Sequence, residues 1–140
     1  MSLFSASFVA HLIAAIFGVG PIVVMAIVGS RAPATGELAL ERRELLARLS
    51  RWVSLALALM LVTGVAMEIG VGGVFHRTWW YRASVLLLLL AGALVGVAGR
   101  RLRTTEPADV PARIRFAARA SRLACALIVA ITLLMTLRPG

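Results

Sequence analysis

The sequence predicts an all-α fold, a four-helix transmembrane bundle made of two similar helical hairpins. Three observations predict it: the apolar composition, four long apolar segments, and the concentration of arginines between some of these segments. Of the 140 residues, 61% are hydrophobic and 15% are charged, and the mean hydropathy is +0.95. Soluble domains are about 45–50% apolar and about 25% charged. This composition excludes a disordered tail, a collagen-like chain and an ordinary soluble enzyme, and it indicates an integral membrane protein.

Four segments have the length and composition of membrane spans. A helix needs roughly 20 apolar residues to cross about 30 Å of hydrocarbon, and the candidates are 5–29, 52–71, 79–99 and 123–137. The fourth is the shortest, and we expect it to extend backwards because arginine side chains at its start can reach the interface. The first has no basic residues ahead of it and is longer than a signal peptide's apolar stretch of about 7–15 residues, so we expect it to remain as a span. We therefore expect one transmembrane domain over 1–140.

The arginines indicate the orientation of the spans. All 15 basic residues are arginines, and the formal net charge is +9. Twelve lie in the connections 30–51 and 100–122, whereas the other side has three: Arg77, Arg82 and Arg138. Because cytoplasmic loops accumulate basic residues, we expect these two connections in the cytoplasm and both termini outside. Arginines near anionic headgroups contribute about 1 kcal/mol each, so the charge indicates an anionic lipid surface and not a nucleic-acid partner.

An internal repeat favours two similar hairpins. Ala47-Arg48-Leu49-Ser50-Arg51 enters the second span, and Ala118-Arg119-Ala120-Ser121-Arg122 enters the fourth. Each follows a charged stretch, so we expect 30–51 and 100–122 to be cytoplasmic helical loops that continue into the spans. Repeats of this kind occur in membrane proteins. The connection at 70–78 is rich in glycine and is expected to be a tight turn.

Small residues in the spans are candidates for helix packing, because lipid supplies no hydrophobic drive between helices. Gly18 lies on a stripe of small residues in the first span, and the third span carries Gly92, Gly96 and Gly99. We expect helix contacts at these four glycines. A homodimer through the face of Gly92 and Gly96 is a further hypothesis.

Ionisable side chains gather near the end expected to be outside. His11 is six residues into the first span, about 9 Å deep, and Glu68 is 16 residues beyond Trp52, about 24 Å along the helix. Arg82 begins the third span, and His76 lies in the turn above it. A His, a Glu and an Arg from three helices are thus expected in one layer. Ionisable residues inside a membrane are functional candidates by default.

Several roles are open for this layer. A Glu68–Arg82 pair would join the outer helix ends, with His11 bonded to a backbone carbonyl. A proton-coupled or metal-ion carrier would use Glu68, and a metal site of His11, Glu68 and His76 has suitable ligand types. A haem b would take His11 as axial ligand, because haem in helical bundles is held by histidines from the helices. A homodimer would supply two copies of His11.

The run His11-Leu12 with Ala15, Gly18 and Gly20, followed by an arginine-rich helix and a span containing Thr63-Gly64, carries a resemblance. It resembles small four-helix bacterial integral membrane proteins of unknown function. In pattern it is similar to copper-resistance protein D-like domains and to the haem-associated protoporphyrinogen oxidase J family. The resemblance covers nearly the whole chain and implies a bacterial inner-membrane bundle. It also implies an axial role for His11, although the chain has no second histidine within a span.

The sequence contains no phosphate loop, nucleophile motif or cluster of Cys and His. Two histidines and six acidic residues provide little material for an active site. We therefore expect no catalytic residues and a non-enzymatic polytopic membrane protein with a structural, accessory or transport-related role. A haem- or metal-binding redox protein and a proton or metal-ion carrier are the alternatives.

Overall fold

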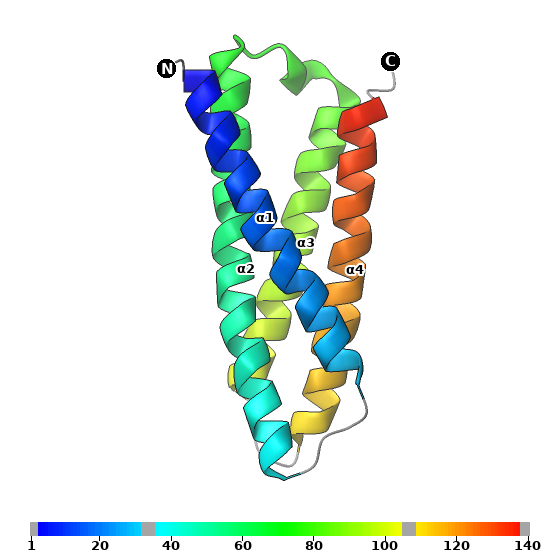
Figure 1. The fold of residues 1–140 in the computed structure, drawn as a ribbon. Coiled ribbons are helices and arrows are strands. Elements are labelled where there is room, and N and C mark those ends of the chain that lie inside the picture. Colours follow the sequence, from blue (N-terminus) through cyan, green and yellow to red (C-terminus); the bar gives the residue numbers. More distant parts are fainter. Residues whose placement is uncertain (1–2, 32–35, 105–108, 138–140) are drawn as a thin grey trace.

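Four long helices form the all-α bundle that the sequence predicts, in a computed structural model that describes residues 3–31, 36–104 and 109–137 (Figure 1). They are α1 (Leu3–Ser30), α2 (Glu37–Gly70), α3 (Trp79–Arg103) and α4 (Val110–Leu137), and the short 3-10 helix η1 (Phe75–Arg77) precedes α3. All four are long and apolar enough to cross a membrane, which indicates a multi-pass membrane protein. Arg138 and the parts of the expected loops at 32–35 and 105–108 lie outside the described residues.

α2 and α4 are longer than the spans within them. With 34 residues α2 is about 51 Å long, and with 28 residues α4 is about 42 Å long. Both exceed a hydrocarbon core of about 30 Å. In each, the arginine-bearing segment is helical and runs without a break into the span, as the sequence predicts. Alanine, leucine and arginine dominate these segments and are strong helix formers.

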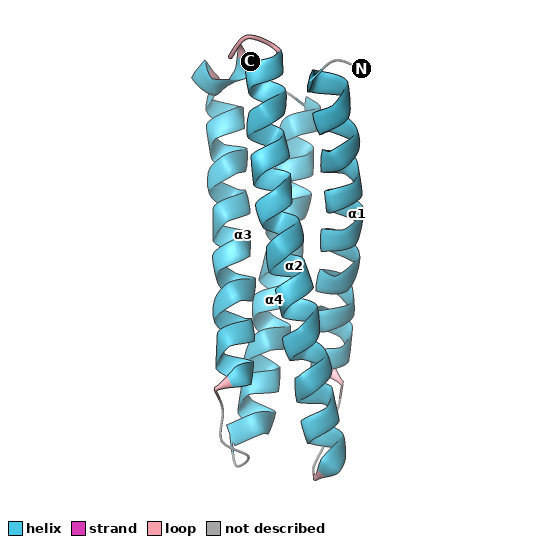
Figure 2. Ribbon diagram, turned by 90° about the vertical axis from the view of Figure 1, so that its left-hand side faces the viewer, coloured by secondary structure: helices cyan, strands magenta, loops and turns pink. Residues whose placement is uncertain are grey.

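The two hairpins, α1 with α2 and α3 with α4, lie side by side, and α1 joins them (Figures 1 and 2). Both termini lie at the same end as the connection 71–78, which we call the outer end; the opposite end is the arginine end. α1 crosses the bundle diagonally. A Cβ built on Gly18 would lie 3.3 Å from the Cβ of Ala56 in α2, and one on Gly29 would lie 2.8 Å from the Cβ of Ala118 in α4. These two contacts let α1 touch both hairpins.

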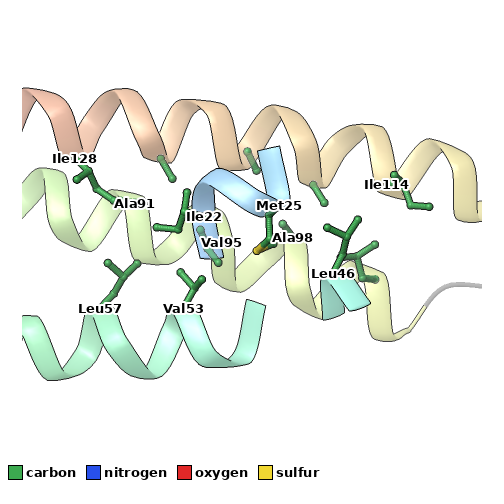
Figure 3. Close-up of a cluster of buried hydrophobic side chains, with 14 of the residues drawn as sticks. Ile22, Met25, Leu46, Val53, Leu57, Ala91, Val95, Ala98, Ile114 and Ile128 are labelled. Atoms are coloured by element: carbon green, nitrogen blue, oxygen red, sulfur yellow. The ribbon is translucent and has the colours of Figure 1, made fainter. Parts of the chain in front are cut away.

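Aliphatic and small side chains fill the bundle axis (Figure 3). Seven of the aliphatic ones are at most 4% exposed: Ile22, Met25, Leu46, Val53, Leu57, Val95 and Leu102. The outward side chains are also apolar, and Phe17 and Trp52 are each 68% exposed. Soluble monomers rarely expose such continuous apolar surface, so the outer surface is suited to lipid.

The glycines of α3 differ in what they contact. A Cβ on Gly99 would overlap the side chain of Ser50 in α2, so this glycine permits a close approach of α2 and α3. At Gly92 and Gly96 a Cβ would meet no described atom within 4 Å. Within the described chain these two glycines make no close helix contact, because the buried face of α3 runs through neighbouring positions such as Val95. Gly92 and Gly96 instead lie on a half-exposed face.

We expect Gly29→Ala to lower the free energy of unfolding by about 1–3 kcal/mol, the usual effect of overpacking. The new Cβ would be 2.8 Å from the Ala118 Cβ and 3.3 Å from its Cα, so α1 must move away from α4. Thermal unfolding in an uncharged detergent measures the change. Gly20→Ala is the control on the same helix, because a Cβ at this position meets open space. Equal melting temperatures for the two variants would contradict the close contact.

Candidate functional site

Glu68 is the buried ionisable group of the outer end. It lies in the last turn of α2 with 7% of its surface exposed. Its Oε1 accepts a hydrogen bond from the backbone N–H of His76 at 2.7 Å and lies 3.4 Å from the Nδ1 of the same residue. Its Oε2 has no hydrogen-bond partner among the described atoms. One carboxylate oxygen thus holds the connection against α2, and the other is available.

The connection turns back onto α2 because two glycines adopt positive φ. Gly72 and Gly73 have φ of +79° and +73°, a region that favours glycine. The turn brings the Gly73 N–H to the main-chain carbonyl of Glu68 at 2.9 Å, which satisfies one of the last carbonyls of the helix. It also directs His76 back over the Glu68 side chain. The glycine-rich turn predicted from the sequence therefore positions the polar layer.

Arg82 reaches the same residue from the other side. Its Nε–H donates to the carbonyl oxygen of His76 at 2.8 Å. Glu68 and Arg82 therefore both bind the main chain of His76, one at the N–H and the other at the C=O. The direct Glu68–Arg82 ion pair considered from the sequence is absent from the described part of the chain. Since η1 places the His76 peptide between them, one residue joins α2, η1 and α3.

His11 is half-buried on α1 and faces α2. Its Nδ1 lies 2.9 Å from the Oγ1 of Thr63, and that hydroxyl donates to the carbonyl of Leu59 at 2.7 Å. Because the hydroxyl proton is used within α2, the assigned arrangement has the Nδ1–H of a neutral His11 donating to Thr63, with Nε2 as an acceptor. Thr63 is thus one partner of the imidazole, and the main chain of Met60 is another, in line with the backbone contact expected for His11. Gly64 leaves room for the ring, since a Cβ there would be 3.6 Å from the His11 Cε1.

A small cavity lies beside His11, lined by residues from all four helices that include Met60, Tyr81, Ser84 and Met135. Its volume is about 60 Å³, which is room for about two water molecules at ~30 Å³ each. Ser84 is 1% exposed, and its Oγ has no hydrogen-bond partner among the described atoms. The cavity therefore fits water, which would satisfy this hydroxyl.

A haem at His11 does not fit this space. Pockets for ligands of cofactor size measure about 300–1,000 Å³, and the cavity beside the imidazole is about 60 Å³. Along the described ranges, no group of three or more His, Cys, Asp or Glu side chains is placed to hold a metal ion. Glu68 and His76 are adjacent, whereas His11 bonds Thr63 about one helical turn below Glu68. The structure thus assembles two of the three candidate metal ligands.

Three polar residues that make or line contacts in this structure were not identified from the sequence as candidate site residues. Thr63 and Ser84 are hydroxyl residues at the level of His11, and comparing depths along the spans would have found them. No feature of the sequence indicated a specific contact for Arg43. Its Nε–H donates to the carbonyl of Leu102 at 2.6 Å and its Nη2 to that of Arg103 at 3.2 Å, so it caps the last turn of α3. This role depends on which helix end lies beside α2.

No family model matches the chain, and curated proteins and solved structures give no match either. The function must therefore be argued from the site itself. The geometry provides one residue, His76, whose main-chain N–H and C=O are both bound at the outer end, one available carboxylate oxygen, and a small cavity suited to water.

Replacing Glu68 with leucine removes the acceptor for the His76 N–H. We expect Glu68→Leu to lower the free energy of unfolding by about 1–3 kcal/mol and to speed amide hydrogen exchange along 71–78. Glu68→Gln keeps an acceptor oxygen, so its free energy of unfolding should fall by less. Arg77→Gln is a control in the same turn, because this exposed residue makes no hydrogen bond or ion pair within the described residues. Unchanged exchange in Glu68→Leu would show that the carboxylate does not hold the turn.

Proposed function

We propose that this chain is a non-enzymatic membrane protein with a structural or accessory role. One observation carries the proposal: an uninterrupted apolar layer crosses the middle of the bundle (Figure 3). Ile22, Val53, Leu57, Ala91 and Val95 contribute to it, and none is more than 4% exposed. A charged group crossing this layer would lose its hydration with no polar partner in return. Within the described residues, a single chain therefore offers no polar path from one end of the bundle to the other.

The polar side chains of the outer end support the same role. Glu68 and Arg82 bind the main-chain N–H and C=O of His76 in the connection, and His11 binds Thr63 across the α1–α2 contact. Each of these bonds joins two different elements of the fold. Hydrogen bonds between membrane helices contribute about 0.6 kcal/mol on average, so together they stabilise the outer end modestly. Their use in joining elements is typical of a structural layer.

A second candidate function is a proton or cation carrier that loads at Glu68. The available Oε2 favours it, because a buried carboxylate oxygen without a partner is costly when ionised. A proton or a cation would remove that cost. His76, whose side chain is 55% exposed, lies 3.4 Å from Oε1 and offers a route from solvent.

Proton flux into liposomes separates these two functions. For the structural role we expect vesicles containing the protein to match protein-free vesicles when a potassium gradient and valinomycin drive protons inward, with a pH-sensitive dye inside. Glu68→Gln should then change nothing. Flux in the original protein that disappears in a folded Glu68→Gln variant would overturn the structural role and establish the carrier. Arg77→Gln controls for the loss of one charged residue at the same end.

We also propose a bacterial inner membrane with both termini outside. The support is the charge asymmetry of the sequence, together with the resemblance to small bacterial four-helix proteins. In the structure the arginine-bearing starts of α2 and α4 lie at one end of the bundle, and the connection 71–78 lies at the other (Figure 1). Anionic headgroups on the cytoplasmic face would then meet the arginine end.

A homodimer through α3 fits the accessory role. Gly92 and Gly96 lie one helical turn apart on a half-exposed face, and each has open space where a side chain would project. Paired small residues allow a second membrane helix to approach closely. We expect the protein to be dimeric in mild detergent and Gly92→Leu/Gly96→Leu to be monomeric but folded. Gly20→Leu is the control, since this glycine also faces open space on α1. A monomeric original protein, by light scattering or cross-linking, would contradict the dimer.

A further inference from the structure

The arginine end contains a pocket of about 240 Å³ between the end of α1, the start of α2 and the first turns of α4. Gly29 and Ala118 form its base, where α1 and α4 come closest. Half of its ten described lining residues are arginines: Arg31, Arg42, Arg115, Arg119 and Arg122. None of its described lining residues is acidic. The pocket is therefore a concentrated positive site built by three helices.

The helix geometry explains the convergence. Arg115, Arg119 and Arg122 are spaced i, i+4 and i+7, which places them on one face of α4. The diagonal course of α1 delivers Arg31 to that face, and α2 adds Arg42. These arginines lie in three separate parts of the sequence. Only the crossing of α1 over α4 brings them to one pocket.

Four of these arginines have no acidic partner. Arg31, Arg115, Arg119 and Arg122 make no ion pair or hydrogen bond within the described chain, and all four are exposed. Some other arginines at this end are engaged, as Arg48 is by Glu44 at 2.5 Å, whereas Arg51 and Arg100 also have no partner in the described chain but lie outside the pocket. Like charges around one pocket repel one another, and an anion between them would reverse that repulsion.

The adjacent helix ends do not supply the attraction. α1 ends at Ser30 with its negative pole beside the pocket, whereas α4 begins at Val110 with its positive pole there. These two contributions oppose each other. The sign and strength of the site are thus set by the guanidinium groups.

We propose that this pocket binds a phosphate group. Guanidinium forks donate paired hydrogen bonds to phosphate oxygens, and several arginines can share the oxygens of one phosphate. The pocket volume of about 240 Å³ equals that of about eight water molecules, enough for a phosphate group with some water. This inference does not rest on the structural role and goes beyond a general attraction to anionic lipid.

Two sources can supply the phosphate. From Pro111 to Arg122 the pocket extends along α4 by 11 residues, about 16 Å. The headgroup zone on one side of a bilayer is about 5–8 Å thick. The pocket is thus longer than the headgroup zone is thick, so a lipid phosphate or a soluble phosphate compound could enter it.

The test uses the full-length protein in an uncharged detergent. Inorganic phosphate is titrated against chloride at equal ionic strength, and phosphatidylglycerol against phosphatidylcholine in mixed micelles. Binding is followed by the shift in melting temperature, since a ligand that binds only the folded state stabilises it, and lipid retention by native mass spectrometry. The pocket variant is Arg119→Gln/Arg122→Gln. Arg51→Gln/Arg100→Gln is the matched control, because these exposed arginines at the same end lie outside the pocket.

We expect the pocket variant to bind at least about tenfold more weakly, since charge-assisted hydrogen bonds are lost, and the control to remain within about twofold. If the pocket variant loses the shift in melting temperature caused by inorganic phosphate, the ligand is a soluble phosphate compound. If it loses only the shift caused by phosphatidylglycerol, the ligand is a lipid headgroup. Equal loss in both variants would show a diffuse charge effect and overturn the site, as would no binding of either probe. If the double variant does not fold, Arg115→Gln serves the same comparison.

Discussion

The diagonal course of α1 is the constraint on which the rest of the structure depends. Gly18 lets α1 lie against α2, and Gly29 lets it end against Ala118 of α4. Between these contacts α1 ties the two hairpins together, because lipid supplies no hydrophobic force to hold them. The same course sets His11 against α2 at one end and brings Arg31 to the arginines of α4 at the other. Packing by small residues thus positions both polar ends.

The polar groups divide into two layers with an apolar layer between them. At the outer end the side chains are used in joining elements, and the peptide of His76 is held by Glu68 and Arg82 from opposite sides. The middle of the bundle is filled by aliphatic side chains such as Val53 and Val95. At the arginine end, four guanidinium groups of one pocket have no partner in the described chain. Satisfied groups stabilise a fold, whereas unsatisfied groups of one sign attract a ligand.

This division assigns different roles to the two ends. The outer end has one buried oxygen available on Glu68 and a cavity suited to water near His11. The available oxygen can bind a proton and the cavity of about 60 Å³ can hold water, but the cavity is too small for a haem. The arginine end has a larger pocket and stronger charge, but it is open to solvent and to headgroups. The two ends of the described bundle therefore differ in the size, charge and exposure of the polar groups that they present.

The sequence by itself determined the class, the four helices, the continuity of the loop helices with their spans and the gathering of polar residues near one end. These follow from composition, segment length and depth along a helix, which are properties of each segment alone. Only the tertiary structure decided that Thr63 pairs with His11, that His76 separates Glu68 from Arg82, and that Gly92 and Gly96 face outward. The tertiary structure also decided that arginines from α2, α4 and the end of α1 meet at one pocket. These features depend on the rotation and crossing of helices, because small shifts in either change which side chains meet.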